Sequence, residues 1–124
     1  MPANARRLFT DWLPVVLYVG VIFTLSSQPH LQPPLHFANA DKLLHLLEYG
    51  GLGLFLARAL RGSMTVSRPA RAATLAIVIG ASLAATDEWY QSFVPGRLSS
   101  VYDALADTVG CALAQVAYAR IVRG

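Results

Sequence analysis

The sequence contains little charge and almost no cysteine. Asp, Glu, Lys and Arg make up 14% of its 124 residues, compared with about 25% in an average soluble domain. The single cysteine, Cys111, lies inside an apolar run, which excludes an intramolecular disulfide and gives no indication of a cysteine metal site. The basic residues stand singly at segment ends, so the net charge of +3 does not indicate a nucleic-acid partner.

The remaining composition is strongly apolar. Hydrophobic residues make up 55% of the chain, and the mean hydropathy is +0.47. A soluble protein of this size has too little interior to bury so much apolar surface, and exposed apolar patches would remain. We therefore predict one domain, residues 1–124, that forms an all-α integral membrane four-helix bundle with the lipid bilayer as its partner. A soluble four-helix bundle with an apolar exterior is the alternative.

Four segments are predicted to cross a bilayer as helices, although the third, whose apolar run ends at Thr86, does so only if its helix continues through Asp87 and Glu88. They lie at about residues 8–26, 40–60, 72–90 and 100–122. Basic residues before the first segment are also typical of a cleaved signal peptide. The length of the segment and the absence of a clear small-x-small cleavage site favour a retained helix. Pro14 is expected in the first turns of this helix, where a missing amide donor costs least.

The charged residues are sorted between the two ends of the predicted bundle. Eight of the ten basic residues fall at one end: Arg6, Arg7, Arg58, Arg61, Arg68, Arg71, Arg120 and Arg123. Because basic residues are retained on the cytoplasmic side of membranes, this end and both termini are predicted to be cytoplasmic. Six of the seven acidic residues fall at the opposite, outer end.

Three predicted helices bring polar residues to the same outer level. Isolated charges in lipid are costly, so these side chains are expected to face the bundle interior and form a polar pocket. The candidate catalytic residues are His45, Glu48, Asp87 and Glu88. The candidate substrate-binding residues are Asp41, Lys42, Tyr49, Gln91, Arg97, Asp103 and Asp107.

His45 has Asp41 four residues before it and Glu48 three residues after it. Either carboxylate would lie next to the imidazole on a helix and could orient it as an acid or base near neutral pH. The same triplet has a spacing compatible with metal ligation, helped by a carboxylate from Asp87 or Glu88. A structural role in the helix core is the third interpretation. We predict that the protein uses no metal ion and no other cofactor.

Two of the remaining candidates, Arg97 and Asp103, also have a second interpretation. Lys42 and Arg97 are the basic residues at the outer end and are expected to hold an anion, a task that suits arginine geometry. Arg97 could instead anchor in lipid head groups or form a buried ion pair. Asp103 follows Ser100 at the spacing of a capping box, which gives it a purely structural alternative. Tyr49 and Gln91 are expected to be hydrogen-bond partners of the groups around them.

Two motifs together resemble the VanZ-like family of small bacterial membrane proteins. The first is Asp41-Lys42-x-x-His45-x-x-x-Tyr49. The second runs from Asp87-Glu88-x-x-Gln91 through Phe93-x-Pro95-Gly96-Arg97 to Ser100-x-x-Asp103, with Gly110 beyond it. The resemblance covers nearly the whole chain. One departure from the family pattern is Asp107, where an asparagine is expected, and it adds a negative charge to the pocket.

The resemblance implies a multi-pass protein of the bacterial inner (plasma) membrane that acts on the cell envelope. The family is named after a protein associated with resistance to the antibiotic teicoplanin. Two functional hypotheses follow. In the first, the outer pocket binds or processes an anionic envelope lipid or glycan precursor, such as a lipid-linked precursor. In the second, the protein is not catalytic and modifies the envelope or antibiotic access, and the polar residues only lock the helices together.

Overall fold

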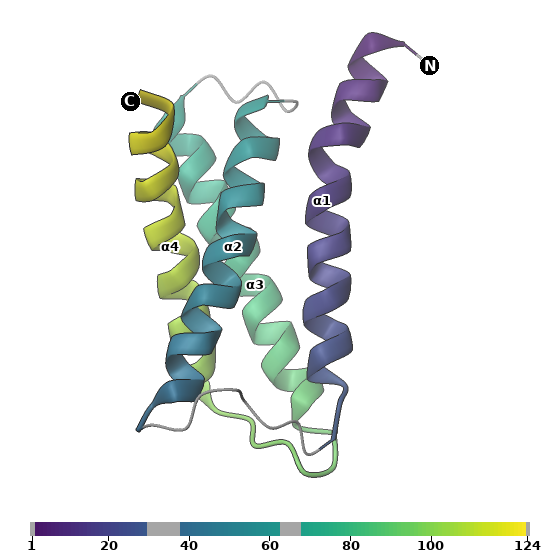
Figure 1. The fold of residues 1–124 in the computed structure, drawn as a ribbon, viewed down its shortest axis with the longest axis vertical. Coiled ribbons are helices and arrows are strands. Elements are labelled where there is room, and N and C mark those ends of the chain that lie inside the picture. Colours follow the sequence, from purple (N-terminus) through teal and green to yellow (C-terminus); the bar gives the residue numbers. More distant parts are fainter. Residues whose placement is uncertain (1, 30–37, 63–67, 124) are drawn as a thin grey trace.

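The computed structural model describes residues 2–29, 38–62 and 68–123, which form four long antiparallel helices (Figure 1). The helices are α1 (Ala3–Ser26), α2 (Ala40–Gly62), α3 (Pro69–Gln91) and α4 (Val101–Arg123). Each is long and apolar enough to cross a membrane. The predicted all-α four-helix membrane bundle is therefore confirmed.

The antiparallel order gives the bundle two chemically different ends. Both termini of the chain lie at one end, where α1 and α3 begin and α2 and α4 end (Figure 1). We call this the basic end, because it holds the eight arginines at helix termini. At the opposite end, α1 and α3 finish and α2 and α4 start. We call it the acidic end, because six of the seven acidic residues lie toward it.

Helix α2 lies between the others and is packed most closely against α4. Glycine makes this approach possible: a Cβ on Gly53 would lie 2.7 Å from the Cβ of Ala114, and one on Gly110 would collide with the backbone of Leu46. Cys111 is fully buried at this contact, and its thiol donates to the carbonyl of Ala76 at 3.3 Å. Small residues therefore bring the backbones together, as expected for helices in a membrane.

The outer surface of the bundle carries many large apolar side chains. Exposed examples occur on all four helices and include Leu17, Val21, Leu47, Val78 and Leu113. A soluble protein would pay a large solvation cost for such a surface, whereas lipid tails solvate it well. This surface favours the membrane interpretation over the soluble bundle.

Three helices extend further at the basic end than the hydropathy pattern predicts. Helices α1 and α3 begin at Ala3 and Pro69, and α2 ends at Gly62. The arginines at these termini can bury their aliphatic stems while the charged groups reach the head groups, so they do not end a helix. The prediction that Pro14 lies in the first turns of its helix is consequently wrong, since it is an interior residue of α1.

Candidate functional site

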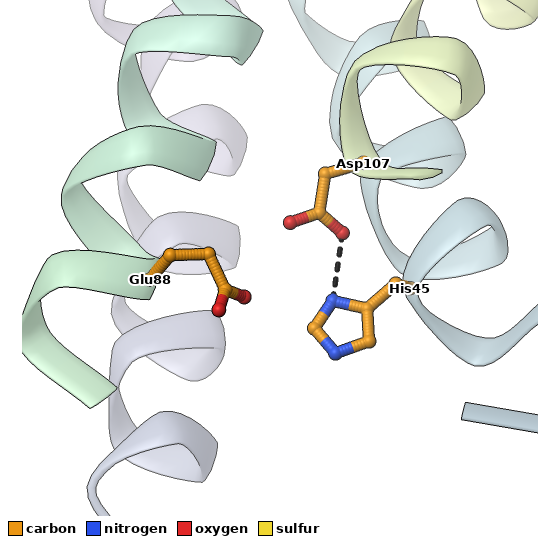
Figure 2. Close-up of side chains that lie close together, drawn as sticks. All are labelled: His45, Glu88 and Asp107. Carbon is orange, nitrogen blue, oxygen red and sulfur yellow. Dashed lines mark hydrogen bonds and ion pairs between the residues drawn. The ribbon is translucent and has the colours of Figure 1, made fainter. Parts of the chain in front are cut away.

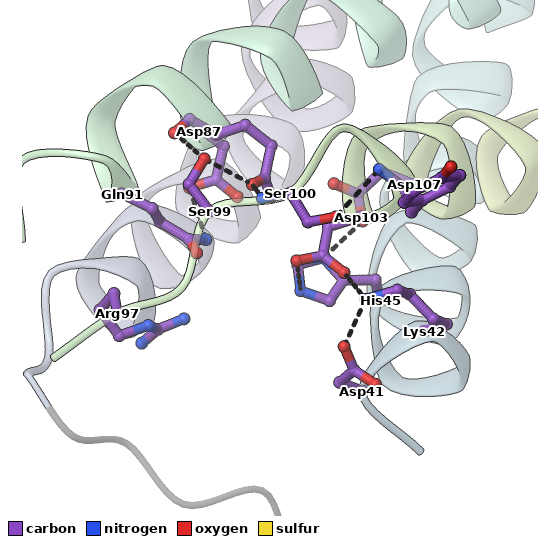
Figure 3. Close-up of polar contacts among 12 residues, drawn as sticks. Asp41, Lys42, His45, Asp87, Gln91, Arg97, Ser99, Ser100, Asp103 and Asp107 are labelled. Atoms are coloured by element: carbon purple, nitrogen blue, oxygen red, sulfur yellow. Dashed lines mark hydrogen bonds and ion pairs between the residues drawn. The ribbon is translucent and has the colours of Figure 1, made fainter. Parts of the chain in front are cut away.

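The polar residues predicted to meet at the acidic end do lie together there. Side chains from α2, α3 and α4 point toward one another between the helices (Figure 3). We call the following set the polar cluster: Lys42, His45, Tyr49, Asp87, Glu88, Asp103 and Asp107. Five of its members, Tyr49 and the four carboxylates, are buried. Such a concentration of buried ionisable groups in a membrane bundle is expensive and calls for a functional explanation.

His45 on α2 is paired with Asp107 on α4. Nδ1 of His45 lies 2.8 Å from Oδ1 of Asp107, so the imidazole N–H donates to the carboxylate (Figure 2). The Asp107 side chain is completely buried, and that of His45 is 15% exposed. The second ring nitrogen, Nε2, lies 3.9 Å from Oδ2 of Asp103. The imidazole is thus held between two carboxylates of the same helix, one turn apart.

Lys42 is engaged by two carboxylates. Its Nζ lies 2.6 Å from Oδ1 of Asp103 and 2.5 Å from Oδ2 of Asp41. The pair with Asp103 joins α2 to α4, whereas Asp41 is mainly exposed. The positive charge of Lys42 is therefore largely balanced within the protein before any anionic ligand arrives.

Glu88 on α3 is fixed by the chain that connects α3 to α4. Its Oε2 accepts hydrogen bonds from the backbone N–H of Ser100 at 2.9 Å and from the hydroxyl of Ser99 at 3.2 Å. Both donors hold the carboxylate in one orientation, and Glu88 faces Asp107 and His45 across the bundle (Figure 2). Ser99 was not predicted from the sequence, because a loop serine belongs to no periodic pattern that would place it.

Asp87 lies beside Glu88 but has different partners. The hydroxyl of Tyr49 donates to Oδ2 of Asp87 at 3.2 Å, and Nε2 of Gln91 lies 3.5 Å from Oδ1. Gln91 also donates to the hydroxyl of Ser26 at the end of α1, at 3.2 Å. Tyr49 and Gln91 are therefore hydrogen-bond donors to a candidate acid, as the sequence predicts, and they tie α1, α2 and α3 together.

Arg97 lies outside the polar cluster. Its Nη1 donates to the backbone carbonyls of Leu25 at 2.9 Å and Gln28 at 3.1 Å. Among the described residues it makes no ion pair. The guanidinium thus fastens the α3–α4 connection to the end of α1, which the sequence did not predict.

Two local interpretations are also corrected. The orienting partner of His45 is neither Asp41 nor Glu48 on its own helix but Asp107, 62 residues away. Ser100 does cap α4, since its hydroxyl accepts from the N–H of Tyr102 at 3.2 Å. The capping box is incomplete, however, because the N–H of Ser100 donates to Glu88 and not to Asp103.

Glu48 is half-buried, and its backbone carbonyl accepts from the hydroxyl of Tyr18 at 2.5 Å.

Two carboxylate oxygens of the polar cluster are buried without a hydrogen-bond partner among the described residues: Oε1 of Glu88 and Oδ2 of Asp107. One ligand atom from each of His45, Glu88 and Asp107 lies within 4.8 Å of the other two. Residues from three helices thus form this group. It differs from the sequence-based triplet on α2, in which Asp41 is exposed and paired with Lys42.

Comparison with known proteins connects this architecture to one family. The sequence profile of the VanZ/LLP1 family matches residues 5–123, nearly the whole chain. Comparison with curated proteins and with solved structures yields no match. The family match confirms the resemblance carried by the two motifs around His45 and Asp103. The chain therefore belongs to the VanZ/LLP1 family of membrane proteins.

Proposed function

We propose that this chain is a protein of the bacterial inner membrane whose polar cluster binds or processes the anionic head group of an envelope lipid or lipid-linked glycan precursor. The basic end collects eight of the ten basic residues. The positive-inside rule then assigns that end to the cytoplasm and the polar cluster to the outer face. Envelope precursors are exposed at that face.

The observation that carries the proposal is the pair of half-buried His45 and fully buried Asp107, with a ring-nitrogen-to-oxygen distance of 2.8 Å. A helix lock can be built from uncharged groups at lower cost, because each buried charge loses its hydration. Histidine is also the side chain that exchanges protons most readily near neutral pH. A carboxylate-oriented imidazole with a second buried carboxylate facing it is therefore suited to acid–base chemistry.

The roles of the individual residues follow from their contacts. Asp107 accepts from Nδ1 and fixes the imidazole orientation, so His45 would donate or accept a proton on the ligand. Glu88, held by Ser99 and Ser100, presents its free oxygen to the same space. Exposed apolar side chains near the acidic end, such as Leu47, would support the lipid tail.

A thermal-unfolding experiment in detergent tests the proposal. Anionic lipids extracted from a bacterial envelope should raise the unfolding midpoint of the wild-type protein by several degrees, because a ligand at about 100 times its Kd stabilises by roughly 2.7 kcal/mol. The rise should be absent in His45→Gln. It should persist in the control Asp11→Asn, which removes the ion pair with Arg58 at the basic end.

Zwitterionic lipids provide the second control and should have little effect on any variant. An equal rise in all three proteins, or a rise with both lipid classes, would show that lipids act on the apolar surface alone. That result would remove the proposed head-group site.

The second candidate function is a non-catalytic membrane protein in which the polar cluster locks the helices. It is favoured by the ties that cross between helices: Lys42 to Asp103, His45 to Asp107, and Tyr49 to Asp87. On this account, removing one partner costs about 3–5 kcal/mol whether or not lipid is present. The same experiment separates the two candidates, because a lock predicts low midpoints for His45→Gln and no lipid effect that depends on His45.

A further inference from the structure

We propose that His45, Glu88 and Asp107 form a binding site for one divalent transition-metal cation of the Zn²⁺ type. The three side chains come from α2, α3 and α4, and one ligand atom from each lies within 4.8 Å of the others (Figure 2). The site shares His45 with the α2 triplet that helical spacing alone would indicate, but its carboxylates come from α3 and α4 instead of from Asp41 and Glu48.

In each of the two carboxylates, one oxygen accepts hydrogen bonds and the other has no partner among the described residues. Glu88 uses Oε2 to accept from Ser99 and Ser100, and Asp107 uses Oδ1 to accept from His45. In each case the other oxygen is buried and has no hydrogen-bond partner in the described chain. Burying an oxygen without a hydrogen-bond partner is unfavourable, and more so if the oxygen is charged. A cation between Oε1 of Glu88 and Oδ2 of Asp107 would satisfy both atoms.

The type of ligand selects the class of cation. An imidazole nitrogen with two carboxylate oxygens suits Zn²⁺ and related transition metals, whereas Mg²⁺ and Ca²⁺ prefer oxygen alone. Metal–ligand bonds of about 2.0–2.2 Å require ligand atoms roughly 3–4 Å apart. Small side-chain rotations would close the present separation. Three protein ligands leave a coordination position open for an external oxygen.

The bound cation would have a role in holding an anionic head group. This step rests on the proposed function in its binding form, because an imidazole that ligates the cation does not also exchange a proton with the ligand. The nearby cation Lys42 is already paired with Asp41 and Asp103, and Nη1 of Arg97 is bound to backbone carbonyls. An anionic head group would therefore approach an excess of carboxylates. A bound divalent cation reverses that balance and offers the open position to a head-group oxygen.

Binding of Zn²⁺ alone to the purified full-length protein tests the site. After removal of metal by a chelator, calorimetric titration in detergent should show one Zn²⁺ per chain, and Mg²⁺ should bind far more weakly. Glu88→Gln and Asp107→Asn keep the side-chain shape and should weaken Zn²⁺ binding by at least about tenfold. The control Asp41→Asn removes an equal charge from an exposed carboxylate at the same end and should bind Zn²⁺ as the wild type does.

The absence of stoichiometric Zn²⁺ binding by the wild-type protein would overturn the metal site. Equal affinities in the three variants would do the same, because they would point to adventitious surface binding. Lipid stabilisation that persists in chelator would retain the proposed function without the cation. Zn²⁺ binding that depends on Glu88 and Asp107, without any lipid effect, would retain the metal site and reject the proposed function.

Discussion

At the scale of single residues, Asp107 and Asp103 show that two buried carboxylates one turn apart can serve different purposes. Asp103 is paired with Lys42 at 2.6 Å and helps to join α2 to α4. Asp107 is completely buried. Its Oδ1 is hydrogen-bonded to His45, whereas its Oδ2 has no hydrogen-bond partner among the described residues. Asp103 therefore has a structural partner of opposite charge, whereas Asp107 carries a charge that its surroundings satisfy only in part.

Asp107→Asn should maintain or increase stability in metal-free detergent. The amide has the shape of the carboxylate and can still accept from Nδ1 of His45 through its oxygen, while the cost of the unpaired buried oxygen, about 1–3 kcal/mol, is reduced. Asp103→Asn should lower stability by about 1–3 kcal/mol, since Lys42 loses a charged partner. Reversible unfolding followed by circular dichroism measures both. A loss of about 3 kcal/mol or more in Asp107→Asn would mean that Asp107 is needed for the fold.

All seven residues of the polar cluster were among the candidates from the sequence, but the candidates Asp41, Glu48, Gln91 and Arg97 lie outside it, and the pairing was not predicted. Helical spacing indicates which side chains share a face of one helix, so Asp41 and Glu48 were the natural partners for His45. The actual partner, Asp107, comes from another helix. Its alignment with His45 depends on how far α2 slides along α4, and a single sequence does not encode that register in any local pattern. The contact between Glu88 and Ser99 was not predicted for the same reason, because no local sequence pattern indicates it.

At the scale of helices, glycine determines how closely α2 and α4 approach. Gly110 faces the backbone of Leu46, and Gly53 faces Ala114 and the backbone of Cys111. Backbone atoms cannot move aside as flexible side chains do. The contact fixes the register in which His45 lies opposite Asp107, so packing and site geometry depend on the same small residues.

Gly110→Ala should destabilise the bundle by about 1–3 kcal/mol or more, because the added methyl group would collide with the carbonyl of Leu46. Gly20→Ala is the matched control: a Cβ on Gly20 meets nothing within 4 Å. Its effect should be neutral or stabilising by up to about 1 kcal/mol, as alanine favours a helix. Unfolding midpoints of the two variants provide the comparison. Equal midpoints would show that α2 and α4 are not held at this distance.

The helices themselves were largely predictable, because long apolar segments leave few alternatives to a membrane span. The predicted ranges differ from the observed ones mainly at the basic end, where Ala3 and Pro69 begin helices earlier than expected. Hydropathy locates the apolar core of a span but not the arginine-bearing turns that continue into the head-group region. Small residues such as Gly50, Gly51 and Gly53 are typical of close helix packing in a membrane, but the sequence does not indicate which helix each would contact.

At the scale of the whole molecule, the central claim is that the bundle sorts its charges across the membrane and presents a buried polar cluster at the outer face. The structure places the polar cluster and the helix-terminal arginines at opposite ends of the bundle. The assignment of those ends to the two sides of the membrane follows from the positive-inside rule. Access to envelope lipids depends on that orientation.

Cysteine labelling of spheroplasts with a membrane-impermeant maleimide tests this claim most directly. Leu98→Cys places a thiol in the α3–α4 connection, where the residue is 90% exposed, and Asn4→Cys places one at the exposed start of α1. The native Cys111 is fully buried and should remain unlabelled. We expect labelling of Leu98→Cys in intact spheroplasts and of Asn4→Cys only after permeabilisation. The reverse pattern would place the polar cluster in the cytoplasm and contradict the account.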